Sequence, residues 1–250
     1  MPQRQRLDAE LVRRRLADTR SRAVQMIDAG TITVNGSVAT KAAHLVHAGE
    51  PIEVLDPPRF VSRGGEKLDA ALIAFAVEVS GLRILDAGAS TGGFSDCLLQ
   101  RGADHVVALD VGHGQLHPRV RNHPRVTVLE RFHIRDVDCD AIGGPVDMVV
   151  ADLSFISLRG VLRPMISVCR AGGPMVLLVK PQFEAGRAHV SKGRGLVTDP
   201  AIHEQICAEV AGALEAHGCV VHAWVPSPIT GAEGNREFLV HATTSLSLDT

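Results

Sequence analysis

The chain is organised around the stretch Ile84-Leu85-Asp86-Ala87-Gly88-Ala89-Ser90-Thr91-Gly92-Gly93-Phe94. Its first residues predict a short buried strand over 83–86, and a helix is expected from about Gly93. Glycines in the connecting turn allow positive φ and let the backbone approach a ligand closely. The spacing D-x-G-x-x-x-G-G differs from the G-x-G-x-x-G pattern that places a pyrophosphate at a helix N-terminus. The stretch is therefore either a ligand-binding loop of another kind or a tight strand–helix turn.

The charge of this loop indicates which ligand it suits. The loop carries an acid and little positive charge, so a cationic nucleoside fits it better than a phosphate does. S-adenosylmethionine (SAM) carries an ammonium group and a sulfonium. The candidate cofactor contacts in the loop are Asp86, Gly88, Ser90, Gly92, Gly93 and Phe94.

Further apolar runs predict the other strands of a sheet. They cover residues 105–110, 126–130, 146–152, 174–180, 219–225 and 237–241, and the spans between them are largely helical in pattern. This alternation predicts an α/β fold with a mainly parallel, Rossmann-like sheet and helices on both faces.

Several of these strands end in charged residues, which would share the carboxyl edge where ligands bind. Asp86, Asp110 and Asp152 end three of them, and Asp110 is a candidate for the cofactor's ribose hydroxyls. Lys180 ends another strand, which is unusual because a buried ammonium must be paired or used. A structural ion pair with Asp152 and a catalytic role are both compatible with this position.

Composition narrows the class of protein. The chain has 250 residues, a net charge of −2 and no apolar run near the roughly 18 residues that span a bilayer. Its charged first residues do not resemble a signal peptide. The five cysteines are scattered without a C-x-x-C pair, which argues against a disulfide framework and a zinc site. We expect a cytoplasmic protein with no metal and no membrane contact.

The first 55 residues predict a separate α+β unit. Leu7, Leu11 and Val12 fit one helix, and Thr19 can cap a second helix that ends at Gly30. The Asn35-Gly36 pair, after 31–34, predicts a hairpin. Residues 1–22 contain seven arginines and three acids, and these arginines are bunched and look unopposed. A solvated face is the ordinary outcome of such a run, but phosphate contact is favoured here.

A linker and a helix connect the two regions. Asp56-Pro57-Pro58 denies the backbone a helix and stiffens the connection. A helix is then expected from Leu68 to Phe75, with Lys67 at its head. A lone lysine in that position points to solvent more often than to a site.

Residues 4–55 also resemble a known RNA-binding domain. The pattern R-L-D-x-x-L-V-x-x-x-L-A-x-x-R-S-R-A-x-x-x-I-x-x-G-x-I-x-V-N-G is similar to the domain first described in ribosomal protein S-four. The resemblance implies that basic side chains on the two helices contact structured RNA. The positions carried over are Arg6, Arg20, Arg22 and Lys41.

The remainder resembles the FtsJ-like ribose 2′-O-methyltransferases. The local patterns are S-R-G-G-E-K, D-A-G-A-S-T-G-G-F, V-V-A-D-L-S-F-I-S, L-V-K-P-Q-F-E and G-A-E-G-N-R-E-F. The resemblance implies a catalytic tetrad of Lys67, Asp152, Lys180 and Glu237 and SAM as the methyl donor. Lys180 would either take the proton of a ribose hydroxyl or, as an ammonium, stabilise the developing alkoxide. Asp152 would hold Lys180, and Glu237 would position Lys67 or the ribose.

The whole chain is similar to the TlyA-type rRNA methyltransferases, a family also labelled haemolysin. This similarity implies an S-four-like RNA-binding domain over 1–56, a linker over 57–63 and a methyltransferase domain over 64–250. It further implies that cytidine in rRNA is the substrate, free or within a ribosomal subunit. The polar tail from Thr243 to Thr250 resembles shorter members that act on the large subunit.

The sequence departs from the family's pattern at two places, and two other functions are alternatives. The segment Glu130-Arg131-Phe132-His133-Ile134-Arg135 differs from the family at the exit of the third strand, and Phe60 stands where a tryptophan is common. A non-catalytic RNA- or ribosome-binding protein is the first alternative. The second is a membrane-active haemolysin, which no amphipathic segment supports. The sequence does not specify an oligomeric state.

Overall fold

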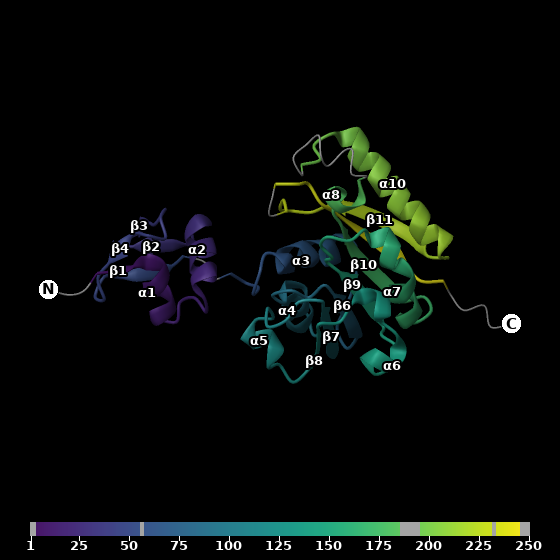
Figure 1. Cartoon of the computed structure of the whole chain (residues 1–250), viewed down its shortest axis with the longest axis horizontal. Coiled ribbons are helices and arrows are strands. Elements are labelled where there is room, and N and C mark those ends of the chain that lie inside the picture. Colours follow the sequence, from purple (N-terminus) through teal and green to yellow (C-terminus); the bar gives the residue numbers. More distant parts are fainter. Residues whose placement is uncertain (1–3, 56–57, 186–195, 232–233, 246–250) are drawn as a thin grey trace. The chain divides into compact units, whose positions relative to one another are not determined.

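The computed structural model describes residues 4–55, 58–185, 196–231 and 234–245 (Figure 1). The chain divides into two compact units, Met1–Arg59 and Phe60–Thr250. Asp56 and Pro57 of the expected linker and the last five residues of the expected polar tail lie outside the described residues.

The N-terminal unit packs two helices against short strands. Leu7, Leu11, Ala23, Met26 and Ile27 from the helices share one core with Ile32 and Val46 from the strands. The elements are β1 (Gln5–Arg6), α1 (Leu7–Arg13), α2 (Arg20–Asp28), β2 (Ile32–Val34), β3 (Ser37–Val38), β4 (Leu45–Val46) and β5 (Ile52–Val54). They form a β1–β4 pair and a three-stranded sheet in the order β3-β2-β5. The sequence patterns did not predict β1 and β4, each of two residues.

Local signals set the ends of these elements. The Thr19 side chain accepts a hydrogen bond from the backbone nitrogen of Arg22 and so caps α2. Gly30 follows α2 with a φ of 70°, which is a common way to end a helix. Asn35 and Gly36 both have positive φ, and antiparallel pairing of β2 with β3 closes the hairpin around them.

The larger unit is built on a seven-stranded sheet in the order β11-β12-β10-β9-β6-β7-β8 (Figure 1). Its strands are β6 (Arg83–Ala87), β7 (His105–Asp110), β8 (Val126–Glu130), β9 (Met148–Ala151), β10 (Pro174–Val179), β11 (Val220–Pro226) and β12 (Phe238–Thr243). The five strands from β10 to β8 are parallel, and β12 runs antiparallel to both β10 and β11. This is the mainly parallel α/β sheet that the strand pattern predicts.

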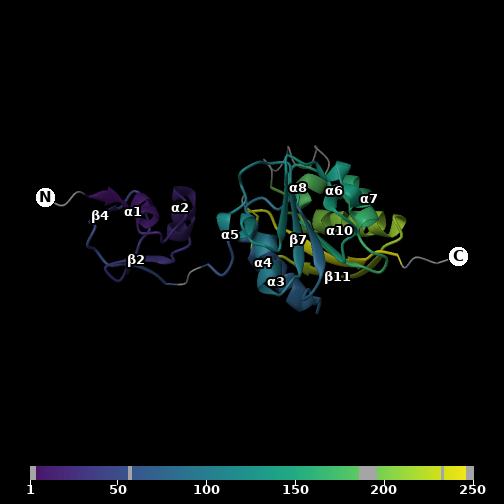
Figure 2. The same cartoon turned by 90° about the horizontal axis from the view of Figure 1, so that it is seen from below.

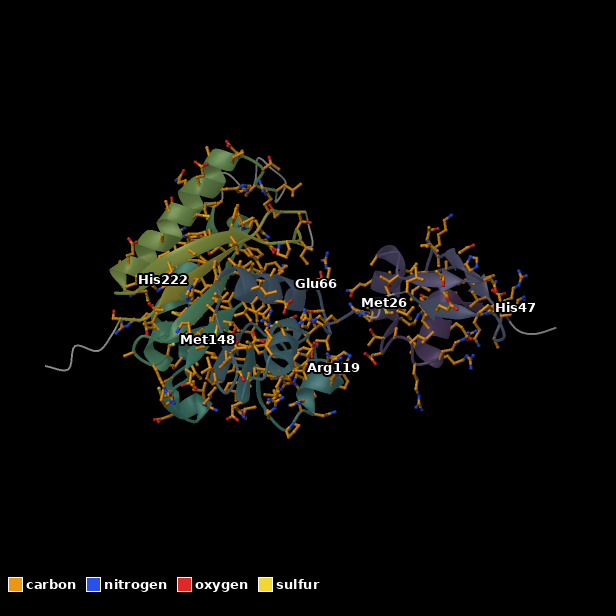
Figure 3. The ribbon with its side chains drawn as sticks, turned by 180° about the vertical axis from the view of Figure 1, so that it is seen from behind. Met26, His47, Glu66, Arg119, Met148 and His222 are labelled. Carbon is orange, nitrogen blue, oxygen red and sulfur yellow. The ribbon has the colours of Figure 1, made fainter. Side chains whose placement is uncertain are left out.

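Alternate residues of each strand supply two separate cores. Ile84 and Met148 face α3 and α4, whereas their neighbours Leu85 and Val149 face α6, α7 and α10. Figure 2 shows the helices on the two faces of the sheet, and Figure 3 labels Met148, which is fully buried. Because both faces are covered, the central strands β9 and β10 are continuous apolar runs rather than alternating patterns.

The helices of this unit differ in length and in how well the sequence marks them. They are α3 (Gly64–Ala74), α4 (Gly93–Gln100), α5 (Pro118–Arg121), α6 (Cys139–Ile142), α7 (Leu162–Val168), α8 (Pro181–Glu184) and α10 (Pro200–Ala216), with 3-10 turns η1 (Ile134–Asp136) and η2 (Leu158–Val161). Asp199 caps α10 through the backbone nitrogen of Ala201, as expected. Among the described residues every helix is too short or too polar to cross a membrane.

The start of α3 differs from the prediction. The helix begins at Gly64 rather than Leu68, so Lys67 lies inside its first turns. A Cβ on Gly65 would clash with the ring of the buried Phe60, so a glycine is required at this helical position. The glycine pair therefore permits close packing of Phe60 and does not delay the helix.

Candidate active site

The glycine-rich loop after β6 is held by close backbone contacts. Gly88 has a φ of 84°, and a Cβ there would lie 2.5 Å from the carbonyl oxygen of Asp152. Gly92 has a φ of 92°, and its Cβ would lie 2.9 Å from Leu116. A Cβ on Gly93 would clash with Ser62. The three glycines therefore let the loop lie against β9, α5 and the segment before α3.

Asp86 lies beneath this loop and does not face either cavity described below. It is fully buried, and Ser95 Oγ donates to its Oδ2 at 2.6 Å, while its Oδ1 has no hydrogen-bond partner among the described residues. Burial raises the pKa of the Asp86 carboxyl to about 7. In this structure Asp86 supports the loop from within, which differs from the expected direct contact with the cofactor.

Two adjoining cavities open at the carboxyl edge of the sheet. The smaller, of about 140 Å³, is lined by the glycine-rich loop including Gly93 and Phe94, by Asp152 and by Lys180. The larger, of about 690 Å³, is lined by Asp110 and by the segment His133 to Arg135. Gly88, Ser90, Asp152 and Ser154 line both. Gly92 lines neither of these two cavities and acts through the packing of the loop.

The lining fits a SAM-sized ligand. A volume of several hundred Å³ with mixed polar and apolar walls is typical of a nucleoside or cofactor site. Leu109, Val111 and Ile156 supply apolar surface in the larger cavity. The side chain of Asp110 accepts hydrogen bonds from the backbone nitrogens of Ser90 and Gly112, so it fixes the loops on either side of the cavity.

The first ion pair of the site joins Lys180 and Asp152. Lys180 Nζ lies 2.5 Å from Asp152 Oδ1 and donates to Ser154 Oγ at 2.9 Å. The two residues follow neighbouring parallel strands, β10 and β9, and the structure brings them together as their strand-final positions predict. Both line the smaller cavity.

The second ion pair is buried. Lys67 Nζ donates to Glu237 Oε2 at 2.5 Å, and the exposed fractions of the two side chains are 10% and 2%. Lys67 therefore points inward and not to solvent, the usual direction for a lone lysine in such a position. The structure brings Lys67 and Glu237 of the expected tetrad together. Neither Lys67 nor Glu237 lines the two cavities. The register of β10 with β12 places Glu237 next to Lys180, directly after the Val179–Phe238 pair.

The sequence patterns did not single out two residues at this edge. Ser154 accepts the hydrogen bond from Lys180, and Phe155 is 92% exposed on the larger cavity. Phe155 has a φ of 64°, which is unusual for a bulky residue. Its ring centroid lies 5.3 Å from that of Phe183, which follows Lys180 by three residues. The D-L-S-F-I-S motif contains both missed residues, but an apolar residue in a motif does not reveal exposure.

The N-terminal unit concentrates arginines around two buried acids. Arg6 donates to both oxygens of Asp8 at 3.0 Å, and Arg20 donates to Asp8 at 2.8 Å. Arg13 and Arg14 bind Glu10 in the same way, at 2.6–2.7 Å. The expectation that the arginines are unopposed is therefore wrong.

These contacts shift the titration of the acids. The Arg6 hydrogen bond lowers the pKa of Asp8 to about 2, and Arg13 lowers the pKa of Glu10 to about 2. The two acids remain charged, yet each meets two arginines, so positive charge is in excess.

Three of the four positions expected to bind RNA lie around the start of α1. Arg6 and Arg20 meet at Asp8, whose backbone nitrogen donates to the carbonyl of Ala42, next to Lys41. Arg22 lies on α2, where its side chain donates to Gln25. Within the described ranges no group of three or more His, Cys, Asp and Glu side chains could hold a metal ion.

Comparison with known proteins identifies both units. Residues 60–244 match the FtsJ-like methyltransferase family, and residues 5–52 match the S4 domain.

Similar proteins match nearly the whole chain. It is 48% identical to the 16S/23S rRNA (cytidine-2′-O)-methyltransferase TlyA of Mycobacterium tuberculosis, over 96% of this chain and 90% of that protein. It is 41% identical to the putative rRNA methyltransferase YqxC of Bacillus subtilis, over 95% of this chain and 85% of that protein. A putative hemolysin from Streptococcus thermophilus has a similar structure, with a TM-score of 0.77, 36% identity and coverage of 100% and 93%.

Proposed function

The chain belongs to the FtsJ-like methyltransferase family, and we propose that it transfers a methyl group from SAM to the 2′-hydroxyl of a cytidine in ribosomal RNA. The observation that carries the proposal is the Lys180–Asp152 pair. Both residues line a cavity that the glycine-rich loop also lines. The match to the S4 domain and to the TlyA relative supports RNA as the acceptor.

SAM would be held by the two cavities beside the glycine-rich loop. When bound, SAM supplies an electrophilic methyl group on a sulfonium. The backbone of Gly88 and Ser90 and the loops fixed by Asp110 would contact it, and the apolar wall at Leu109 would take its base. Asp152 and Ser154 line both cavities, so the cofactor and the lysine are brought to one place.

Lys180 would act directly on the ribose. A 2′-hydroxyl is a poor nucleophile because its pKa lies far above 7, so it needs help as its proton leaves. The Lys180 ammonium would donate a hydrogen bond to the oxygen as negative charge develops on it, while the hydroxyl proton passes to solvent water. The new bond joins the ribose oxygen to the methyl carbon, and the bond from that carbon to the sulfonium breaks and leaves a neutral thioether. Asp152 and Ser154 fix the direction of this side chain through their contacts with Nζ. Alignment of the two substrates would supply much of the remaining rate.

The Lys67–Glu237 pair lines neither cavity and would support Lys180 from within the protein. Its side chains are almost fully buried, and each provides the opposite charge that the other needs away from water. Glu237 directly precedes β12, and the pairing of β12 with β10 places it beside Lys180. It would therefore fix the end of β10 that carries the reacting lysine.

Phe155 would receive the target base. Its ring is exposed on the larger cavity, and it lies on the same loop as Asp152 and directly after Ser154. Aromatic rings stack with nucleobases that leave their helix, and each such contact contributes about 1–3 kcal/mol. The Phe155–Phe183 pair thus offers a stacking surface near the reacting lysine.

The proposed substrate is large-subunit rRNA, recognised in part by the arginines of the N-terminal unit. The TlyA relative is named for both 16S and 23S rRNA, so both subunits belong in the test. Arg6 and Arg20 keep further guanidinium donors available beyond those that bind Asp8. These donors would contact phosphates.

The test is methyl transfer from labelled SAM to isolated large and small subunits and to their free rRNA. Lys180→Ala is expected to abolish transfer while rRNA binding persists, and nucleoside analysis is expected to reveal 2′-O-methylcytidine. Undiminished transfer by the variant would contradict the mechanism. Ribose-methylation mapping of rRNA from cells with and without the protein would identify the nucleotide.

Two other functions have distinct outcomes in the same experiments. A protein that only binds RNA would show no SAM binding by calorimetry. The structural relative from S. thermophilus carries the name putative hemolysin, so leakage of liposomes by the pure protein would indicate membrane activity.

A further inference from the structure

Two loops carry the groups nearest the proposed reaction, and they come from neighbouring strands. The loop 152–157 follows β9 and includes Asp152, Ser154 and Phe155. The turn α8 follows β10 and starts directly after Lys180. The parallel pairing of β9 with β10 ends at Ala151 and Leu177, so the ladder does not fix the two loops relative to each other.

Glu184, the last residue of α8, joins the two loops. Its side chain is 2% exposed. Ser157 Oγ donates to its Oε2 at 2.7 Å, and the backbone nitrogen of Leu158 donates to its Oε1 at 2.5 Å. The carboxylate therefore caps η2, which immediately follows the loop 152–157.

Arg159 also binds Glu184, through both its side-chain carboxylate and its backbone carbonyl. Its Nε donates to Glu184 Oε2 at 3.1 Å, and its Nη2 donates to the Glu184 carbonyl at 2.9 Å. Its Nη1 lies 2.7 Å from Glu209 on α10. Arg159 thus neutralises the buried carboxylate and ties α8, η2 and α10 together.

The loop needs such a restraint because its conformation is strained. Phe155 has a φ of 64°, a left-handed backbone conformation that a bulky residue rarely adopts. Its ring is almost fully exposed, so core packing does not hold it in place. The contacts of Glu184 lie two to four residues beyond Phe155 and restrain the end of the loop.

We propose that Glu184 is a positioning residue for methyl transfer, a role that rests on the proposed function. Its carboxylate holds the loop 152–157 against the turn after Lys180. It thereby sets the Lys180–Asp152 contact and the position of Phe155 beside Phe183.

The direct test compares Glu184→Gln with Glu209→Gln. An amide oxygen can still accept from Leu158, but the amide nitrogen cannot accept from Ser157 or Arg159, so the clamp is weakened without a change of shape. The single-turnover rate at saturating SAM and rRNA is expected to fall about 10- to 100-fold, since small misplacements of reacting groups have effects of this size. Glu209→Gln removes the charge that pairs with Arg159 on its outer side, at a residue whose other hydrogen bond within the described part of the chain comes from Gln205 on α10, and the rate is expected to stay within about twofold of wild type.

Rates are expressed per folded molecule, at a temperature well below the melting transition of each variant. A Glu184→Gln rate within twofold of wild type would overturn the proposal. If that variant does not fold, Ser157→Ala removes one donor of the same clamp and is expected to lower the rate about threefold or more. An unchanged Ser157→Ala rate would then overturn the proposal.

A double-mutant cycle with Phe155→Ala separates positioning from general stability. If Glu184 acts through the loop, the double variant is expected to be little slower than the slower single variant, because both changes remove the same arrangement. Multiplicative losses would mean that Glu184 does not act through Phe155 and would overturn that part of the proposal. Failure of the proposed function is distinguishable, because the wild-type protein would then transfer no methyl group to rRNA.

Discussion

Each buried carboxylate of the N-terminal unit binds two arginines, whereas each paired acid of the proposed active site binds one lysine. Asp8 and Glu10 together meet four guanidinium groups. Asp152 and Glu237 meet one ammonium group each. Asp86, in the same large unit, is hydrogen-bonded to the Ser95 hydroxyl rather than to a cation, and its pKa is raised.

The difference agrees with the roles proposed for the two regions, an RNA-binding surface and a reacting site. Two arginines per acid leave an excess of positive charge, which suits a polyanion such as RNA. The planar guanidinium also binds a carboxylate through two parallel bonds and holds its direction. One lysine per acid leaves a neutral site in which a single ammonium can be directed at one oxygen atom. The following four changes test this contrast, from the largest expected effect to the smallest.

Lys180→Arg should have the largest effect if the active site needs a single ammonium. A guanidinium would bind Asp152 through its fork and would not place the same donor at the ribose oxygen. The single-turnover rate of methyl transfer is expected to fall about 10³-fold, the upper range for loss of one oriented donor. SAM affinity by calorimetry serves as the control and should change little. A loss of less than tenfold would show that any cation suffices there.

Asp8→Ala should destabilise the N-terminal unit alone. The substitution removes the acceptor shared by Arg6 and Arg20 and leaves two guanidinium groups close together. We expect a loss of about 2–3 kcal/mol, since several charge-assisted hydrogen bonds disappear from a partly exposed network. Hydrogen exchange of α1 and α2 amides would measure the loss, with β6 amides as the internal reference. Equal destabilisation of β6 would contradict the separation of the two units.

The two units should respond to pH in opposite directions. The folded-state pKa of Asp86 is about 7, above its usual value, so its contribution to stability is greatest below pH 4 and is lost as pH rises towards 7. The pKa values of Asp8 and Glu10 are lowered to about 2, so their contribution is lost as pH falls from about 4 to 2.

Asp86→Asn tests the first half of this contrast. Denaturant unfolding followed by the fluorescence of Trp224, the single tryptophan, reports on the larger unit. The wild-type stability is expected to fall by about 2 kcal/mol between about pH 5 and about pH 7, and the variant should show a flatter profile. A profile that is identical in both proteins would mean that Asp86 is ionised throughout.

Arg20→Ala should weaken rRNA binding about three- to tenfold and reduce its salt dependence by about one phosphate contact. Arg170→Ala is the matched control. Arg170 also pairs with an acid, Asp147, but it lies in the larger unit, before the start of β10 and so away from the carboxyl edge that carries Lys180. An equal effect of both substitutions would indicate that binding depends on net charge only.

The sequence was informative wherever a signal was local. Apolar runs located the strands, and Thr19, Gly30 and Asn35-Gly36 marked their element ends correctly. The Lys180–Asp152 pair also followed from the rule that parallel strands end at one edge.

Contacts between distant residues were not predictable in the same way. Asp8 binds Arg20 across 12 positions, so the arginine-rich segment looked unopposed in a linear reading. Lys67 points inward to Glu237, which lies 170 positions away in the sequence, so no local pattern shows the pairing. Glu184 stands within a motif, but its role depends on Ser157 and Arg159 in another loop.

The place of β12 in the sheet has a consequence for synthesis. Among the described strands it is the last to leave the ribosome, yet it inserts between β10 and β11. Glu237, the partner of Lys67, is synthesised 170 residues after it. A nascent chain therefore holds an open sheet edge and an unpaired lysine until β12 is made. If the protein methylates ribosomes, it becomes competent only after β12 has been made and has paired with β10 and β11.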